Sequence, residues 1–228
     1  MVAWLADEQA TSMASVLIVD DHALLADGLA NALKEVGLAA RVSRGPRADD
    51  IVTAARDHRP DVVLLDLAMG GEIGMTVPLI TRLREEGCHV LVLTGSTDRA
   101  LLGSCLEAGA VGVVSKAESF EDLLDKVLAT AAGRSSMPPG SRDELLGALR
   151  RERTAERARQ APFDTLTGRE RAVLGALMDG SSAEEIATAA VVSVATVRSQ
   201  IRSILEKLGV HSQVAAVAMA HRARWEPC

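Results

Sequence analysis

Four short apolar runs, rich in Val, Ile and Leu, occur in the first half of the chain, and each is followed by polar residues. Runs of this length and composition are typical of strands buried on both faces of a parallel sheet. In such a sheet the ligand site lies beyond the carboxyl ends of the strands. The pattern therefore predicts one site that gathers three carboxylates, a hydroxyl and an amine. The runs and their polar residues are 16–19 with Asp20 and Asp21, 62–65 with Asp66, 90–93 with Thr94, and 111–115 with Lys116.

Helical patterns separate these runs, so strand and helix alternate along this half of the chain. Such alternation is typical of parallel sheets with right-handed crossover helices. A weaker apolar run at 40–43 supplies one more strand. We therefore expect an α/β domain, a five-stranded doubly wound parallel sheet, over residues 15–132. Its helices are expected at roughly 22–36, 47–58, 75–86, 98–108 and 119–132, ending near Gly37, Gly87, Gly109 and Gly133.

The composition is that of a protein with a packed core, since 48% of the 228 residues are hydrophobic and 25% are charged. No apolar stretch approaches the roughly 18 residues that span a membrane. Residues 1–14 are expected to be an N-terminal extension, and they lack the basic and apolar segments of a secretory signal. The cysteines form no CxxC pair and no metal-ligand spacing with histidine, which indicates reduced thiols. Together these features predict a cytoplasmic protein without a membrane segment.

Phosphoryl chemistry fits the polar residues at the strand ends. The carboxylate of Asp66 can attack a phosphoryl group and form an aspartyl phosphate. Asp20 and Asp21 would bring two more negative charges beside it, which a hard divalent cation with oxygen ligands would relieve, and Mg²⁺ fits this role best. Lys116 can pair with a phosphoryl oxygen, and the hydroxyl of Thr94 can hydrogen-bond the transferred group.

The same residues carry a resemblance to the receiver domain of two-component response regulators. The matching segments are Asp20-Asp21-His22, Asp66 after Val-Val-Leu-Leu, Thr94 after Val-Leu-Val-Leu, and Ser115-Lys116. The resemblance implies that a sensor histidine kinase phosphorylates Asp66. It also implies that Mg²⁺ is held by Asp21, Asp66 and the backbone carbonyl of Ala68, with assistance from Asp20.

Two further features bear on enzymatic alternatives and on switching. The haloacid dehalogenase type of phosphatase also uses a strand-end aspartate, but it needs a second Asp two positions later, where this chain has Ala68. We therefore do not expect an enzyme. Receiver domains usually carry an aromatic residue where this chain has Val113, and a proline where it has Gly70. Because Val113 cannot swing as a ring does, the sequence predicts a reduced response to phosphorylation.

A segment that breaks the alternation, residues 133–162, is predicted to be a linker with a connector helix. Residues 134–141 contain two prolines and a glycine, and Asp143 to Gln160 then has a helical pattern. Three leucines near its start are followed by a strongly charged end. Two interpretations stay open, a solvated connector helix and a dimer-forming helix that uses the leucines. We favour the first, because three leucines fall short of three heptads.

The rest of the chain, residues 163–228, is predicted to be a small all-α unit of four helices. Each helix is expected to begin at a capping residue, and two have the Ser/Thr-x-x-Glu pattern of a capping box. The third helix should run from Ser193 to Leu208 and end at Gly209. The expected capping residues are Thr167, Ser182, Ser193 and Ser212, with Glu170 and Glu185 completing the boxes.

The third helix has the pattern of a helix that enters the major groove of DNA. Its apolar stripe runs through Val197, Ile201, Ile204 and Leu208 and leaves polar side chains facing outward. In such a position Arg prefers guanine and Gln prefers adenine. The predicted DNA contacts are Thr196, Arg198, Ser199, Gln200, Arg202 and Lys207.

Residues 163–221 resemble the LuxR-type DNA-binding domain. The matching segments are Leu166-Thr167-Gly168-Arg169-Glu170-Arg171, Glu185-Ile186-Ala187, Thr196-Val197-Arg198, and 204–210. With the receiver, this resemblance implies a transcriptional response regulator of the NarL/LuxR class, a homodimer that binds double-stranded DNA at inverted-repeat sites. The alternative is a phosphorelay or protein-interaction regulator whose helical unit docks a protein partner.

The distribution of charge along the chain gives evidence both for and against DNA binding. The net charge of −6 argues against nucleic acid by itself. The acidity lies in the first domain, however, because residues 162–228 carry seven Lys and Arg against seven Asp and Glu. The LuxR-type family often has Lys where this chain has Glu184, and a carboxylate there repels phosphate. The sequence therefore predicts DNA binding of modest affinity.

Overall fold

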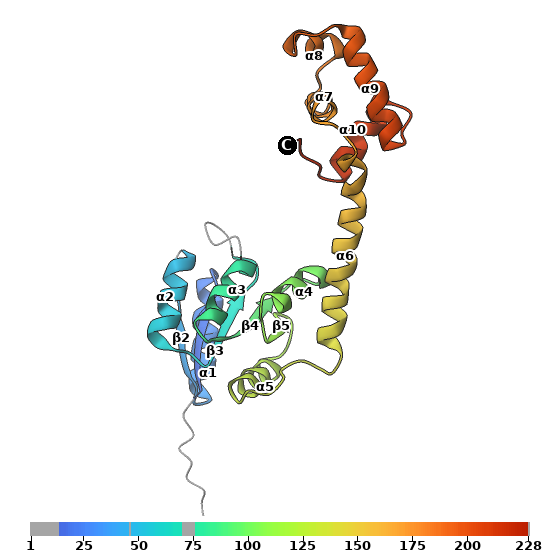
Figure 1. Cartoon of the computed structure of the whole chain (residues 1–228). Helices are drawn as coiled ribbons and strands as arrows, with labels where there is room; N and C mark the ends of the chain where they lie inside the picture. The colour runs from blue at the N-terminus through green and yellow to red at the C-terminus, as the bar shows by residue number, and fades with distance from the viewer. Residues whose placement is uncertain (1–13, 46, 70–75, 228) are drawn as a thin grey trace, which may run out of the picture. The chain divides into compact units, whose positions relative to one another are not determined.

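The computed structural model of the protein describes residues 14–45, 47–69 and 76–227. The predicted N-terminal extension lies outside these residues apart from Ala14, as do Gly70 and Cys228. The chain divides into two compact units, Met1–Arg150 and Arg151–Cys228 (Figure 1). The division therefore falls inside the segment that the sequence marks as a linker.

A five-stranded parallel sheet forms the centre of the first unit, as the alternating pattern predicted (Figure 1). The strands are β1 (Ser15–Val19), β2 (Ala39–Val42), β3 (Val62–Asp66), β4 (His89–Thr94) and β5 (Gly112–Ser115). Their order is β2-β1-β3-β4-β5, with Val16 of β1 in register with Ala40 and Val62 on its two sides. This is the doubly wound order, and it places the carboxyl ends of all five strands at one edge of the sheet.

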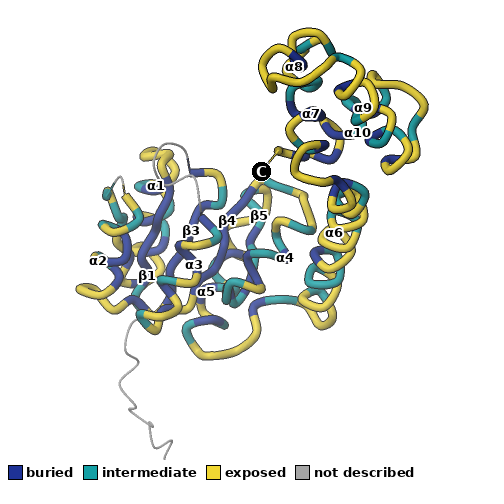
Figure 2. The backbone as a smooth tube through the Cα atoms, turned by 45° about the horizontal axis from the view of Figure 1, so that its top comes forward, coloured by how far each residue is buried: buried dark blue, intermediate teal, exposed yellow. Residues whose placement is uncertain are grey.

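Helices cover both faces of this sheet, and each lies within one residue of its expected range. They are α1 (Ala23–Glu35), α2 (Ala48–His58), α3 (Thr76–Glu85), α4 (Arg99–Glu107) and α5 (Phe120–Ala131). One core cluster joins the sheet to α2, α3 and α4 through residues such as Ile51, Leu79 and Cys105. The other joins the sheet to α1 and α5 through Leu33 and Val127. Figure 2 shows the sheet as the buried centre between these helices.

The next helix, α6 (Ser141–Asp164), begins as part of the first unit. Arg142 donates to the carbonyl oxygens of Leu106 and Ala110, at the end of α4. The leucines that suggested a dimer helix pack within the chain instead, against the core that includes α4. They are Leu145 and Leu146, which are partly buried, and Leu149, which is 7% exposed. The start of α6 is therefore packed on the first unit rather than solvated, and the dimer interpretation stays a prediction.

The approach of α6 to α4 is close because α4 has a glycine at the contact. A Cβ atom on Gly103 would lie 2.4 Å from the carbonyl oxygen of Leu145 and 3.0 Å from the Cβ of Leu149. Any larger residue at position 103 would push the two helices apart. The position of α6 thus depends on a residue about forty positions earlier, a dependence that no local pattern reveals.

The second unit contains the end of α6 and the four predicted helices, α7 (Gly168–Met178), α8 (Ala183–Ala189), α9 (Val194–Leu208) and α10 (Gln213–Arg222). All four predicted caps are present, each accepting a backbone N–H, and both capping boxes form. Gly209 ends α9 in the left-handed region, with φ of 66°. The apolar stripe of α9 is buried, and Phe163 of α6 stacks on Trp225 with ring centroids 5.4 Å apart.

Across the described ranges, no helix combines the length and the apolar character needed to cross a membrane.

Candidate functional site

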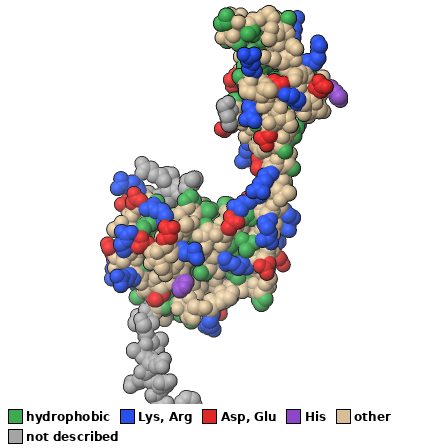
Figure 3. Space-filling model, in the orientation of Figure 1, with side chains coloured by type: hydrophobic (Ala, Val, Ile, Leu, Met, Phe, Trp, Pro, Cys, Tyr) green, Lys and Arg blue, Asp and Glu red, His purple; other side chains and the backbone are tan. Residues whose placement is uncertain are grey.

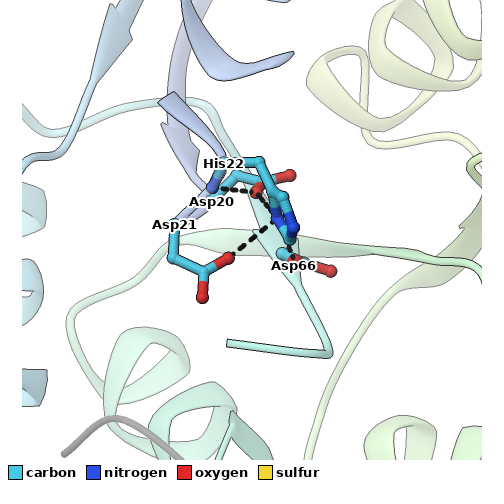
Figure 4. A group of neighbouring side chains, drawn as sticks. All are labelled: Asp20, Asp21, His22 and Asp66. Atoms are coloured by element: carbon cyan, nitrogen blue, oxygen red, sulfur yellow. Dashed lines mark hydrogen bonds and ion pairs between the residues drawn. The ribbon is translucent and has the colours of Figure 1, made fainter. Parts of the chain in front are cut away.

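The carboxyl edge of the sheet brings together the residues that the sequence selected there. Asp20 follows β1 and Asp66 ends β3, and both are buried, with 8% and 1% of their surface exposed. Asp21 is exposed beside them (Figure 4). The backbone N–H of Lys116 donates to the carbonyl of Thr94 at 2.8 Å, so the polar ends of β4 and β5 lie side by side.

Lys116 joins the two buried carboxylates. Its Nζ atom lies 2.9 Å from Oδ2 of Asp66 and 3.0 Å from Oδ2 of Asp20. Burial lowers the pKa of Lys116, but the contacts with Asp66 and Asp20 outweigh burial and raise it above its ordinary value. The ammonium is therefore charged at neutral pH. It offsets only part of the negative charge that Asp20, Asp21 and Asp66 bring to this edge.

The two carboxylate oxygens of Asp66 have different surroundings. Oδ1 accepts the backbone N–H of Ala68 at 3.2 Å. Oδ2 is buried and accepts no well-aligned hydrogen bond from the described part of the chain, so its contact with Lys116 is an ion pair. The Lys116 ammonium offsets the charge of this oxygen, which still has lone pairs free for a further partner. This oxygen is therefore suited to a phosphoryl group or a cation.

His22 lies beside this site, although the sequence analysis gave it no role there. Its Nδ1 lies 2.9 Å from Oδ1 of Asp21, 3.1 Å from Oδ1 of Asp20 and 4.0 Å from Oδ2 of Asp66 (Figure 4). One ligand atom from each of these four residues lies within 4.8 Å of the others. The only signal in the sequence was its position directly after the two aspartates. Three carboxylates in one place are the donors that a hard divalent cation prefers, so the residues present fit Mg²⁺.

Thr94 connects this pocket to the start of α4. Its side chain is buried, and its Oγ1 accepts the backbone N–H of Ser96 at 2.9 Å. Two residues later Asp98 caps α4 by accepting the N–H groups of Ala100 and Leu101. Val113, where an aromatic residue was expected from the resemblance, is partly buried against the core that includes α4.

The helix α9 exposes only part of the set that the sequence proposed for DNA. Thr196, Arg198, Ser199, Arg202 and Lys207 are exposed to solvent. Gln200 is half-buried, and with Thr196 it lines a groove of about 660 Å³ against α7 and α8. The predicted DNA contact of Gln200 therefore stays a prediction. This residue lies on the flank of α9 that faces its neighbouring helices.

Lys207 also lies apart from the exposed arginines. Its Nζ is 2.7 Å from Oε2 of Glu170, a residue with only 6% of its surface exposed. The hydroxyl of Ser203 donates to the other carboxylate oxygen of Glu170 at 2.6 Å. The same carboxylate accepts the backbone N–H of Thr167 at 2.7 Å. Lys207 thus ties α9 to the start of α7, while the residue remains exposed to solvent.

Comparison with known proteins agrees with this division into two units. Residues 16–128 match the response regulator receiver domain, and residues 164–220 match the family described as bacterial regulatory proteins, luxR family. The probable transcriptional regulatory protein NarL of Mycobacterium tuberculosis is 34% identical over 212 residues, which cover 92% of this chain and 94% of that protein. The chain belongs to the response regulators with a LuxR-type DNA-binding domain.

Other relatives of this response regulator agree with that assignment. The nitrate/nitrite response regulator protein NarP of Escherichia coli is 35% identical over 207 residues, which cover 90% of this chain and 93% of that protein. A solved LuxR-family two-component response regulator from Aurantimonas sp. SI85-9A1 aligns with a TM-score of 0.51 at 26% identity, over 63% of this chain and 99% of that one. These relatives are named as response regulators or, for NarL, as a probable transcriptional regulatory protein.

The surface of this response regulator carries no single dominant charge on the face that Figure 3 displays. Lys and Arg side chains alternate there with Asp and Glu side chains over the second unit.

Proposed function

We propose that this response regulator accepts a phosphoryl group on Asp66 from a sensor histidine kinase. The observation that carries this proposal is the buried Oδ2 of Asp66, 2.9 Å from Nζ of Lys116, inside an acidic cluster. In the transfer, an oxygen of Asp66 forms a bond to phosphorus while the bond from phosphorus to the histidine nitrogen of the kinase breaks. The electron pair of that bond stays on the nitrogen, and an aspartyl phosphate results.

The proposed cofactor is Mg²⁺, held by Asp20, Asp21, Asp66 and the backbone carbonyl of Ala68. When bound, the ion would offset the negative charge of these carboxylates and coordinate phosphoryl oxygens. Lys116 exchanges its contact with Asp66 for a phosphoryl oxygen and keeps its contact with Asp20. The hydroxyl of Thr94 donates to another phosphoryl oxygen while its lone pairs remain available to Ser96. Both contacts are charge-assisted and therefore strong.

We further propose that the exposed face of α9 binds double-stranded DNA in the major groove. Arg198 and Arg202 are suited to bidentate contacts with guanine, and Ser199 between them can accept or donate a hydrogen bond. Lys207 is paired with Glu170, and Thr196 and Gln200 lie beside the groove at the edge of this face. A homodimer would present two such helices to the two halves of an inverted repeat.

Replacement of Arg198 tests the DNA-binding part of this proposal. Arg198→Ala should weaken binding to the preferred duplex by about 1–3 kcal/mol, or about 5- to 150-fold in Kd, because a bidentate base contact is lost. Gln200→Ala should cost less, because Gln200 faces α7 and α8. Fluorescence anisotropy with duplexes chosen by in vitro selection measures both effects.

Arg222→Ala is the matched control for this measurement. It removes the same charge from α10, outside the exposed face of α9. Equal losses of affinity in Arg198→Ala and Arg222→Ala, or a larger loss in Gln200→Ala than in Arg198→Ala, would contradict the assignment of the DNA-binding face.

A further inference from the structure

An ion pair between α8 and α9 has no role in the function proposed so far. Nη2 of Arg198 donates to Oε1 of Glu184 at 2.9 Å. Glu184 lies in the first turn of α8, and buried residues such as Ile186 and Val197 hold the two helices together. The side chains of Arg198 and Glu184 are 67% and 60% exposed. A pair so exposed contributes little to the stability of the fold.

We infer that Glu184 is a specificity-determining residue of the DNA-binding unit. Its carboxylate competes with DNA phosphates for Arg198, and so it weakens binding to non-specific DNA more than binding to the preferred site. This inference rests on the proposed role of the exposed face of α9 in DNA binding.

The physical basis is the difference between the two kinds of DNA contact. Non-specific binding comes from Lys and Arg that neutralise phosphates and release counterions. While Arg198 is paired with Glu184, it brings a neutral pair to the DNA backbone and releases one counterion fewer. At the preferred site a bidentate contact with guanine is stronger than an exposed ion pair, so Arg198 changes partner there. Discrimination is the difference between these two affinities.

The charge balance of the unit makes this one carboxylate important. Residues 162–228 carry seven Lys and Arg against seven Asp and Glu, so their net charge is zero. The exposed face of α9 presents two arginines, Arg198 and Arg202, and one of them is paired with Glu184. Glu184 therefore offsets about half of the positive charge that this face can offer to phosphate.

The test is a comparison of Glu184→Gln with the wild-type full-length protein on two DNAs. One is the highest-affinity duplex from in vitro selection with the wild type, and the other is a shuffled duplex of the same length. Kd is measured on each from 50 to 200 mM salt, and Glu206→Gln, which removes the same charge from α9, is the control. Glu184→Gln should bind the shuffled duplex about three- to tenfold more tightly, with a salt slope steeper by about one. Its Kd for the selected duplex should change by less than half of the fold-change that is measured on the shuffled duplex.

Two outcomes would overturn the inference. One is an equal shift on both DNAs, as a general charge effect would give in Glu206→Gln. The other is weaker binding to the selected duplex with the shuffled duplex unchanged, since Glu184 would then contact a base directly. Arg202→Ala, measured in parallel, separates these results from failure of the proposed function. If Arg202→Ala leaves both affinities unchanged, α9 is not the DNA-binding helix, and the proposed function itself fails.

Discussion

Asp66→Ala should abolish acceptance of a phosphoryl group by this protein. Asp66 ends β3, and its Oδ2 lies 2.9 Å from Nζ of Lys116. Among the described carboxylates of this pocket, only Asp66 also has a buried oxygen without a well-aligned hydrogen bond. Without it no oxygen is positioned to attack phosphorus between the acidic cluster and the ammonium. Intact-protein mass spectrometry after treatment with a small phosphodonor and Mg²⁺ should show one added phosphoryl group in the wild type and none in the variant.

Two controls make this result specific. Asp49→Ala removes an exposed carboxylate on α2, with 76% of its side chain exposed, and should accept phosphate as the wild type does. A chelator of divalent cations should prevent phosphorylation of the wild type, because three carboxylates would then repel the incoming phosphoryl group. An equal gain in mass in Asp66→Ala would mean that another residue is the acceptor.

Glu170→Ala should markedly destabilise the helical unit. The carboxylate of Glu170 accepts hydrogen bonds from the N–H and hydroxyl of Thr167, the hydroxyl of Ser203 and the ammonium of Lys207. Alanine would leave these donors without their partner, at a cost of about 2–4 kcal/mol. Urea unfolding followed by the fluorescence of Trp225, with Trp4 replaced by Phe, measures this change. Glu206→Ala, at an exposed position of α9, should cost less than about 0.5 kcal/mol.

The same carboxylate predicts how the helical unit responds to acid. Burial raises the pKa of Glu170, but hydrogen bonds from Lys207, Ser203 and Thr167 outweigh burial and lower it to about 2, from an ordinary value of 4.5. Because the pKa of Glu170 is lower in the folded state than in the unfolded state, its ionised carboxylate stabilises the fold at pH values above the unfolded-state pKa. That stabilisation is lost as pH falls from about 4.5 towards 2. The unfolding free energy of the wild type should therefore decline over this range more steeply than that of Glu170→Ala. Parallel declines would contradict the assigned ion pair.

Local patterns predicted the elements of the fold well, because their causes lie within a few residues. For example, the helical spacing of apolar residues, the capping residue Ser193 and the terminal Gly209 together predicted α9, which runs from Val194 to Leu208. The acidic edge was also predictable, since parallel strands must end at the same edge of a sheet. What the sequence could not provide was the choice of tertiary partner. The leucines of α6 have the same pattern whether they meet solvent, a second copy or α4, and Gly103 of α4 is the residue that lets α6 approach closely.

The same limit applies to the DNA-binding helix. Gln200 is polar and lies beside the apolar stripe, so the sequence places it equally well toward DNA or toward α7 and α8. The structure places it half-buried beside the groove that α7 and α8 line. Lys207 resembles a phosphate contact until its partner Glu170, 37 positions earlier, is located. His22 was missed because a residue next to an acidic pair has no signal of its own.

The central claim, that one chain couples phosphorylation of Asp66 to DNA binding through α9, has one direct test. The Kd for the selected duplex is measured with and without the small phosphodonor, in Mg²⁺, for the wild type and for Asp66→Ala. The phosphodonor should change the Kd of the wild type and leave that of Asp66→Ala unaltered. Because Val113 replaces the usual aromatic residue, we expect the change to be smaller than about a hundredfold, or about 2.7 kcal/mol. No change in the wild type, or the same change in Asp66→Ala, would contradict the claim.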